Sequence, residues 1–475
     1  MRIKINKNKV LSNNILILLF VLVLITILVR FFHLNFEDYW FDEINSFWLS
    51  DPTISDKNTY IERYLKPGQP DQITFYFFLK YFFKIFGYSD VVGRYFSFVF
   101  GCLSIPIIVY SSFKIKNNNS FLFLFFLLSI NSYLIAYSQE VRVYSLLLFV
   151  SSINIFLFIK LINNINQKSE WYLYLTFLIS SILNTSLHIF AFLIMISEIV
   201  FLFYLYYINK SVQLKLIVTV FLSFFFALLF NYEFIFLKYN INTWIPPLES
   251  GFFLDFFFSK FFGSKIMGII YLVTLIYLLV KFRLFILYKN KNLLFLLILT
   301  ICIYLIPIIY SLIVRPVLID RYIIFVLIPL FILLTHLIWN LKEKKIKYFF
   351  IFILSFSTIT NAFIELTFKK AEKPQFTKLL DNIDNKISRN VTFDTNEDTE
   401  FIMLSNYFLN KKTFQEKNLK IVKFSQIKKI SKVWVVCYSP LNTVNCSSKF
   451  STVKEFKSIK NKSFHLTELF FLVKK

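Results

Sequence analysis

The chain consists of long apolar runs separated by two kinds of loop that alternate along it. Loops of the first kind are short and basic, and they lie at residues 2–9, 114–119, 160–168, 210–215, 281–291 and 342–347. Loops of the second kind carry the polar residues Asp42, Glu43, Gln139, Glu140, Arg142, His188, Asp320 and Arg321. Runs of about 20 apolar residues cross a bilayer, and basic loops stay on its cytoplasmic side. The pattern predicts a polytopic α-helical membrane protein whose second kind of loop lies on the non-cytoplasmic side.

Eleven apolar runs are expected to span the membrane. They lie at residues 15–32, 91–113, 120–137, 141–159, 171–187, 189–208, 216–236, 264–281, 293–313, 322–341 and 347–365. The first follows a basic N-terminus but lacks a small-residue cleavage site, which favours a retained span over a signal peptide. Two aromatic stretches, 74–86 and 252–262, are predicted to lie along the membrane interface, the depth that aromatic side chains prefer.

The composition changes after residue 365. Short β-branched segments at 390–393 and 432–438 are typical of strands, and 401–409 is typical of a helix. We therefore expect a transmembrane module at residues 1–365, with a first outer loop at 33–90, and a small α/β domain at 366–475. Eleven crossings from a cytoplasmic N-terminus place this domain on the non-cytoplasmic side.

The net charge is +24, of which +11 lies in residues 366–475. No nucleic-acid-binding motif accompanies this charge, so a nucleic-acid partner is not expected. The basic loops and anionic lipid head groups account for it instead, which makes membrane lipids a partner. Cys102 and Cys302 lie in apolar spans, where a buried thiol is ordinary. Cys437 and Cys446 could pair if their region is exported to an oxidising space.

The acidic pair Asp42-Glu43 is the first candidate for chemistry. It follows Trp40 and Phe41 about ten residues beyond the first span, just above the outer membrane surface. A carboxylate there could act as a general base. Both residues are also candidate ligands for a divalent cation. The alternative is an ordinary solvated acidic loop.

The segment 138–145 (SQEVRVYS) joins two spans by a tight outer turn. Glu140 and Arg142 must then lie near the bilayer surface, where unpaired charges are costly and mark functional sites. Arg142 suits a phosphate through its bidentate guanidinium. The alternative is a structural Glu140–Arg142 pair that pins the hairpin.

Further cationic or titratable residues occur at the same outer level, namely Arg94, His188, Arg315 and Arg321. Together with Arg142 they could surround a phosphate or diphosphate head group. Each alone has a simpler explanation, because an arginine at the end of a span often reaches only to the interface.

These residues form a pattern that resembles the polytopic glycosyltransferases of the C-type (GT-C) fold. The pattern joins the Asp42-Glu43 pair to the segments 86–90 (FGYSD), 93–97 (GRYFS) and 137–146 (YSQEVRVYSL). It is most similar to bacterial family 39-like proteins, grouped with protein mannosyltransferases, the aminoarabinose transferase of lipid A and Rgt-type lipopolysaccharide transferases. His188 and the Asp320-Arg321-Tyr322 segment fit the same pattern, and the resemblance covers residues 15–340.

The resemblance implies an inverting transfer of a sugar from a polyprenyl-phosphate donor to a lipid, glycan or protein acceptor outside the cytoplasm. It also implies a place in the bacterial inner membrane, with Asp42 as the base and Glu43 as its neighbour or rival. The implied donor phosphate ligands are Arg94, Arg142, His188 and Arg321, and the implied orienting residues are Glu140, Tyr144 and Tyr322. Family members usually carry a His-Pro-Pro-Leu-like segment where this chain has 69–74 (QPDQIT), which leaves the metal unassigned.

Two other functions fit parts of the pattern. A transporter or flippase of a lipid-linked saccharide would need a charged path through the bilayer, for which Glu198 and Glu233 are candidates. Discontinuous half-helices typical of transporters are not evident in the sequence. An inactive GT-C scaffold would be consistent with the altered segment 69–74.

Overall fold

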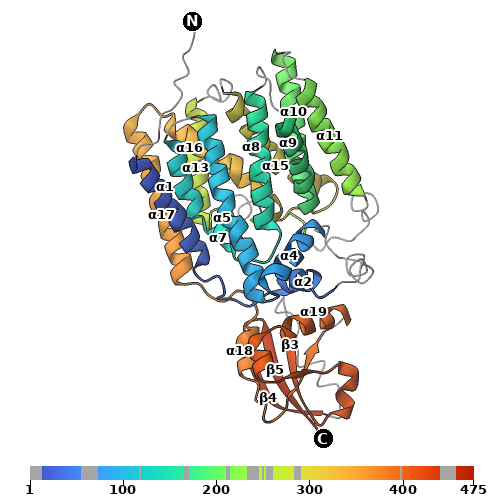
Figure 1. Ribbon diagram of the computed structural model, residues 1–475. Coiled ribbons are helices and arrows are strands. Elements are labelled where there is room, and N and C mark those ends of the chain that lie inside the picture. The colour runs from blue at the N-terminus through green and yellow to red at the C-terminus, as the bar shows by residue number, and fades with distance from the viewer. Residues whose placement is uncertain are drawn as a thin grey trace. The chain divides into compact units, whose positions relative to one another are not determined.

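The computed structural model describes residues 13–54, 73–116, 119–164, 171–209, 214–232, 245–248, 251–252, 260–282, 290–395, 398–438 and 456–475 of the 475-residue chain. The chain forms two compact units (Figure 1). The first, which we call the helical unit, comprises Met1–Phe32, Phe98–Ser138 and Val143–Thr367. The second, the α/β unit, comprises His33–Ser97, Gln139–Arg142 and Phe368–Lys475. The α/β unit therefore combines the first loop and the 139–142 turn with the C-terminal region.

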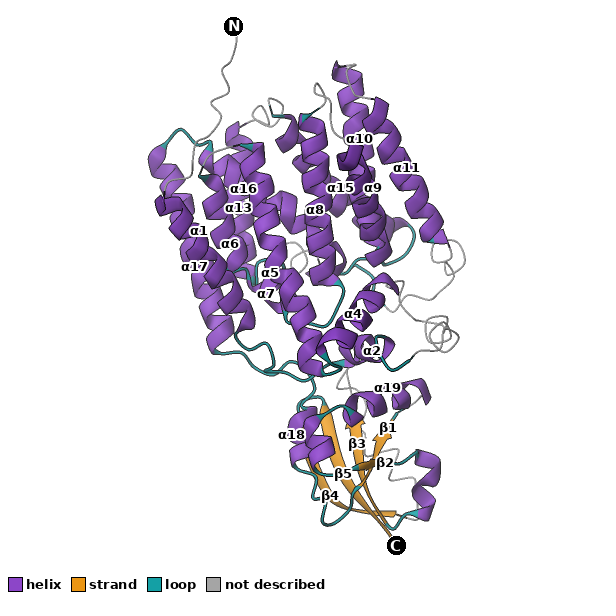
Figure 2. Cartoon of the chain, viewed as in Figure 1, coloured by secondary structure: helices purple, strands orange, loops and turns teal. Residues whose placement is uncertain are grey.

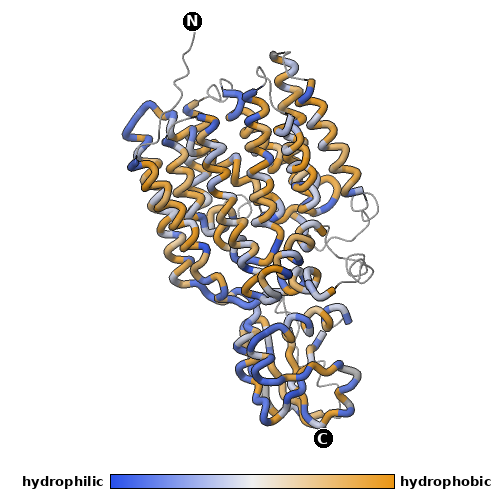
Figure 3. Tube along the Cα trace, viewed as in Figure 1, coloured by the Kyte–Doolittle hydropathy of each residue, from blue (hydrophilic) through white to orange (hydrophobic). Residues whose placement is uncertain are grey.

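All eleven predicted apolar stretches contain helix (Figure 2). The helices are α1 (Asn13–Phe31), α5 (Asp90–Ile115), α6 (Ser120–Ser129), α7 (Ser132–Ser138), α8 (Tyr144–Asn163), α9 (Trp171–Leu187), η1 (Ile189–Ala191), α10 (Phe192–Asn209), α11 (Leu214–Phe230), α13 (Lys265–Phe282), α15 (Lys291–Ile313), η4 (Asp320–Val326), α16 (Leu327–Trp339) and α17 (Lys344–Thr367). Their traces are dominated by apolar residues (Figure 3). Each run that hydropathy predicted therefore contains helix.

Among the described residues, eight helices are long and apolar enough to cross a membrane, or nine if α6 and α7 count as one span. The helices α9 and α11 have 17 residues each and are shorter than the usual span. The chain is thus an integral membrane protein. The predicted start of the fourth span at residue 141 is wrong, because residues 139–143 form a non-helical turn and α8 begins at Tyr144.

The third span is broken between α6 and α7, which are bent by 56°. A break leaves helix-end carbonyls without partners, and lipid offers no hydrogen bonds to replace them. The fully buried Arg30 of α1 supplies donors, at 2.7 Å to the Ser129 carbonyl and 3.0 Å to the Leu128 carbonyl. On the other side of the break, the Asn131 side chain accepts from the Leu134 amide at 2.9 Å. The redirected α7 leads the chain into the 139–142 turn.

The α/β unit contains the helices α2 (Phe41–Leu49), α4 (Ile73–Phe86), α18 (Phe376–Asp381), α19 (Asp398–Leu409) and α20 (Lys412–Glu416), and the short η5 (Phe424–Lys429). Its strands are β1 (Asn390–Asp394), β2 (Lys420–Ile421), β3 (Lys432–Tyr438), β4 (Phe456–Phe464) and β5 (Thr467–Lys474). They form one sheet in the order β2-β1-β3-β5-β4. β1 pairs in parallel with β2 and β3, whereas β5 pairs antiparallel with β3 and β4.

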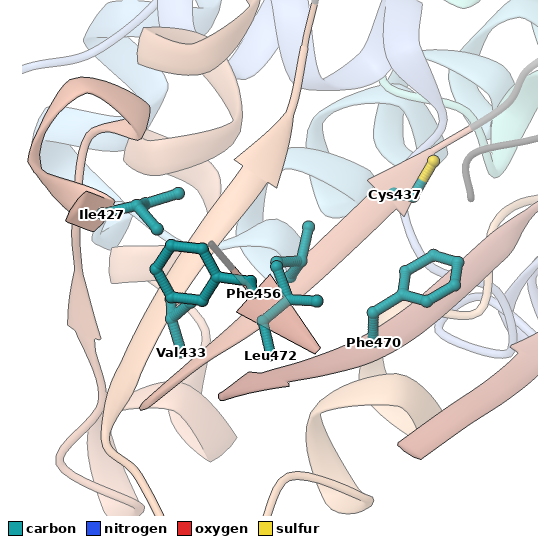
Figure 4. Packing of buried hydrophobic residues seen from close by; sticks show 7 residues of the cluster. Ile427, Val433, Cys437, Phe456, Phe470 and Leu472 are labelled. Carbon is teal, nitrogen blue, oxygen red and sulfur yellow. The ribbon is translucent and has the colours of Figure 1, made fainter. Parts of the chain in front are cut away.

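One face of this sheet carries an apolar core (Figure 4). Alternate residues of a strand share a face, so β3 contributes Val433, Val435 and Cys437 while β5 contributes Phe470 and Leu472. The predicted strands at 390–393 and 432–438 and the predicted helix at 401–409 are confirmed by β1, β3 and α19. The remaining strands were not predicted.

Several predictions concern residues outside the described part of the chain. They include most of the aromatic stretch 252–262, the residues 69–72 of the altered segment, Glu233, and Cys446 as a partner of Cys437. The predicted interfacial stretch 74–86 does form a helix, α4, and its depth in the membrane stays a prediction. The domain boundary at residue 365 also stays a prediction.

Candidate active site

The acidic pair lies in the first turn of α2. Trp40 precedes the helix, and its backbone amide donates to the Glu43 carboxylate at 3.4 Å, which is the capping interaction expected of a glutamate at the third helical position. Asp42 is the second residue of the helix, and a carboxylate is stabilised there by the positive end of the helix dipole. Both carboxylates are therefore placed by the local fold.

Glu43 is fully buried, and both of its carboxylate oxygens are occupied. One oxygen accepts from the backbone amide of Val141 at 2.9 Å. The other accepts from the Lys373 ammonium at 2.7 Å, and the Arg94 guanidinium lies 3.8 Å away. Burial alone would raise the pKa of Glu43, but Lys373 and Arg94 outweigh it, so that the pKa lies below its ordinary value. Glu43 is thus ionised, and its carboxylate links Lys373 and Arg94 to the backbone of the 139–142 turn.

Asp42 is the more accessible of the two carboxylates, since its side chain is 28% exposed and that of Glu43 is not exposed at all. Its carboxylate lies 3.5 Å from the Arg142 guanidinium. The same guanidinium donates to the Asp42 carbonyl at 3.1 Å and to the Ser46 hydroxyl at 3.3 Å. Arg142 is therefore fixed against the start of α2, and Asp42 is left reachable.

Glu140 and Arg94 also contact this part of the chain. The Trp40 indole donates to the Glu140 carboxylate at 2.6 Å. Arg94 is 3% exposed and donates to the carbonyls of Leu34 (2.9 Å) and Asp38 (3.3 Å). Arg94 is thus bonded to the backbone of the first loop. The structure brings together five of the predicted site residues, which are Asp42, Glu43, Arg94, Glu140 and Arg142, and we call this set the carboxylate cluster.

Three lysines that the sequence did not single out contact the acidic first loop. Lys369 lies 3.8 Å from the Glu37 carboxylate, Lys373 contacts Glu43, and Lys411 lies 2.5 Å from Asp38 and 2.8 Å from Asp90. Burial would lower the pKa of Lys411, but Tyr407 and the two carboxylates raise it above the ordinary lysine value. No local signal marks these lysines, because the region around them is rich in lysine throughout.

The helical unit contains a second group of predicted residues, which we call the aromatic cluster. The ring of His188 lies 4.8 Å from that of Tyr322 and 6.4 Å from that of Tyr144, between ring centroids. The guanidinium carbon of Arg321 lies 5.9 Å from the Tyr144 centroid, a cation–π distance. His188 Nδ1 accepts from the Phe190 amide at 3.2 Å, which places the proton of the neutral ring on Nε2.

The described residues do not contain a cluster of three or more His, Cys, Asp or Glu side chains arranged to hold a metal ion. Asp42 and Glu43, the two candidates, each contact a protein cation instead, namely Arg142 and Lys373. A divalent cation therefore stays a prediction without an assigned ligand set. The proposed roles of all the site residues, including the phosphate role considered for Arg315, likewise stay predictions.

Glu198 is the transport candidate that falls within the described residues. It lies in α10, is fully buried, and neither carboxylate oxygen has a hydrogen-bond partner among the described residues. A charged path would require further ionisable groups in contact with it. The described part of the chain supplies none in hydrogen-bond reach, so Glu198 does not by itself support transport.

The chain has the fold that its sequence resemblance predicts, that of the C-type glycosyltransferases. It is similar to the crystal structure of ArnT from Cupriavidus metallidurans in the apo state, with a TM-score of 0.57, 10% identity, and coverage of 96% of this chain and 97% of that chain. It is equally similar to ArnT from the same organism bound to undecaprenyl phosphate, with a TM-score of 0.57, 8% identity, and coverage of 97% and 98%. No protein-family model and no curated protein sequence matches the chain.

Proposed function

We propose that the protein transfers a sugar from a polyprenyl-phosphate donor to a hydroxyl group of a lipid, glycan or protein acceptor. The observation that carries this proposal is the contrast between the two neighbouring carboxylates. Glu43 is buried and ionised by its partners, whereas Asp42 is 28% exposed beside Arg142. An accessible base next to a phosphate-binding cation is what such a transfer requires. The fold is shared with ArnT, a protein crystallised with undecaprenyl phosphate.

In this reaction the acceptor oxygen attacks the anomeric carbon of the donor sugar. The acceptor O–H proton passes to the Asp42 carboxylate as the new C–O bond forms. The bond between the anomeric carbon and the phosphate oxygen breaks, and the polyprenyl phosphate leaves with the bonding electrons. Attack on the side opposite to the phosphate inverts the anomeric configuration. Arg142 stabilises the charge that develops on the phosphate.

The other predicted residues receive different roles. We propose that His188 and Arg321 contribute to donor phosphate binding, and that Tyr144 and Tyr322 orient these two side chains. The Phe190 amide donates to His188 Nδ1, so a neutral His188 ring carries its proton on Nε2 and can act there as a donor. Arg94 is better suited to holding the first loop than to binding phosphate, because two of its donors already serve backbone carbonyls.

We further propose that the α/β unit faces the non-cytoplasmic side, because the basic loops lie at the opposite ends of the spans. Single cysteines placed at position 118 and at position 415 test this orientation in intact cells. An impermeant thiol reagent should label position 415 and leave position 118 unlabelled. Labelling at position 118 without labelling at position 415 contradicts the proposed orientation.

The base assignment is tested with Asp42→Asn in membranes supplied with polyprenyl-phosphate sugars. The variant should insert and fold normally and should lose about 10²–10⁴-fold in transfer rate, the usual contribution of a general base. Asp381→Asn is the matched control, since Asp381 is an exposed aspartate of the same unit, and it should transfer at the wild-type rate.

Three results would contradict the proposal. Near-normal turnover of Asp42→Asn refutes Asp42 as the base. If Glu43→Gln loses transfer while Asp42→Asn transfers normally, Glu43 and not Asp42 is the base. Movement of the lipid-linked sugar across the bilayer by the wild-type protein, with no bond made or broken, identifies a flippase.

A further inference from the structure

The C-terminal region supplies cations to an acidic segment that lies more than 300 residues earlier in the sequence. The contacts are Lys369 with Glu37, Lys373 with Glu43, and Lys411 with both Asp38 and Asp90. All these residues belong to the α/β unit. One of the three lysines, Lys373, reaches the carboxylate that stands next to the proposed base.

The Lys373–Glu43 contact is shorter than the Arg94–Glu43 and Arg142–Asp42 ion pairs. Its 2.7 Å length compares with 3.8 Å from Glu43 to Arg94 and 3.5 Å from Asp42 to Arg142. A buried carboxylate stays ionised only if it is paired and hydrogen-bonded. Lys373 meets both needs, since its ammonium also donates a hydrogen bond to the carboxylate. The ionised state of Glu43 therefore depends on a residue of the C-terminal region.

Glu43 in turn holds the turn that carries Arg142. Its second carboxylate oxygen accepts from the Val141 amide at 2.9 Å, one residue before Arg142. Arg142 reaches back to the Asp42 side chain and to the Asp42 carbonyl. Glu43 thus connects the helix that bears the base to the turn that bears the phosphate ligand, and Lys373 holds Glu43 from the other side.

We propose that Lys373 is a positioning residue for sugar transfer: it fixes Glu43 and, through Glu43, the relative placement of Asp42 and Arg142. This role rests on the function proposed above and extends it to the C-terminal region. It differs from a purely stabilising contact, because displacing reactive groups by about 1 Å lowers turnover far more than it lowers stability.

The test compares turnover in full-length variants whose folded fraction is measured in parallel by thermal unfolding in detergent. Lys373→Met removes the charge and keeps the length of the side chain, whereas Lys373→Arg keeps the charge. Lys412→Met is the matched control, because Lys412 lies in the same region and its side chain is 90% exposed. Glu43→Gln and the double variant Lys373→Met/Glu43→Gln complete a double-mutant cycle with Lys373→Met and the wild type.

Lys373→Met should lower kcat per folded molecule by about 10²-fold, and Lys373→Arg should retain clearly more turnover than Lys373→Met. Lys412→Met should match the wild type. A residue that acts through another has no effect once that other residue is removed, so the double variant should have the kcat of Glu43→Gln alone.

The proposal is overturned if Lys373→Met keeps the wild-type kcat per folded molecule. It is also overturned if the losses in Lys373→Met and Glu43→Gln multiply in the double variant, because the two residues then act independently. If the wild-type protein transfers no sugar from any polyprenyl-phosphate donor, the result refutes the proposed function itself and not only the role of Lys373.

Discussion

The two compact units handle buried polar groups in different ways. In the helical unit, buried hydroxyls such as those of Ser197 and Thr335 donate to the carbonyl four residues earlier in their own helix. Its buried Arg30 donates to backbone carbonyls. In the α/β unit, buried charges instead face one another, as Glu43 faces Lys373 and Lys411 faces Asp38.

This difference shows which buried polar groups link residues that are distant in the sequence. Neutral hydrogen bonds within a helix satisfy polar groups at little cost and place no constraint on distant residues. A buried ion pair adds little net stability relative to an apolar pair, and it costs much when one partner is lost. In this chain the buried pairs Glu43–Lys373 and Asp38–Lys411 hold residues in and just before the first turn of α2.

The largest effect is expected for substitution of Arg142, on the KM for the donor. Arg142→Ala removes the charge-assisted phosphate contacts that we propose, worth about 1.5–3 kcal/mol, so the KM for a polyprenyl-phosphate sugar should rise by about 10–100-fold. Arg142→Lys should give a smaller rise, because an ammonium lacks the bidentate fork. Arg389→Ala, which removes an exposed arginine of the same unit, should leave KM unchanged. A donor KM near the wild-type value in Arg142→Ala would show that Arg142 only braces α2.

Glu43 offers the next effect, on stability and its pH dependence. At pH 7, Glu43→Gln leaves Lys373 and Arg94 without their buried counter-charge and should lower the free energy of unfolding by about 3 kcal/mol. The pKa of Glu43 is below its ordinary value of 4.5 in the folded chain. The stabilisation is therefore present above about pH 4.5 and is lost as the pH falls through the folded-state pKa.

Thermal unfolding of the wild type and Glu43→Gln from pH 7 to pH 3.5 measures this dependence. The difference in stability between the two proteins should shrink as the pH falls below about 4.5. A difference that stays constant over this range would mean that Glu43 contributes through packing alone, and the contrast between the two units would weaken.

The smallest effect is expected in the helical unit, at the exposed pair of Lys281 and Glu343. Their charged groups are 2.7 Å apart, but the side chains are 44% and 53% exposed. Solvent screens such pairs, so Glu343→Gln should leave the melting temperature unchanged within error. A clear drop in melting temperature would show that this unit, too, depends on ion pairs.

The sequence predicted the helices well because apolar run length is a direct signal of membrane spans. It missed the break between α6 and α7, where a single Asn131 interrupts an apolar run and the donors come from Arg30, about 100 residues away. It found β1 and β3, which are β-branched, and missed β4. That strand contains Lys457, Lys460 and Lys462 and forms the edge of the sheet, where lysine is common.

The candidate site shows the same limit. Asp42, Glu43 and Arg142 could be found because each is a charged residue in an outer loop, close to the end of an apolar run. The resemblance favoured Asp42 over Glu43 as the base, but the residues themselves did not separate the two, since they are adjacent carboxylates whose burial and partners only the structure shows. Lys373 was missed because a lysine among many lysines carries no local signal, and only the three-dimensional contact distinguishes it.

The separation of Glu43 and Lys373 has a consequence for biosynthesis. The two residues are 330 positions apart in the chain. At about 5–20 residues per second, translation reaches Lys373 roughly 20–60 s after Glu43 has been made. The acidic segment is therefore made without its lysine counter-ions, and the proposed catalytic geometry can be completed only after the segment that carries Lys373 has left the ribosome.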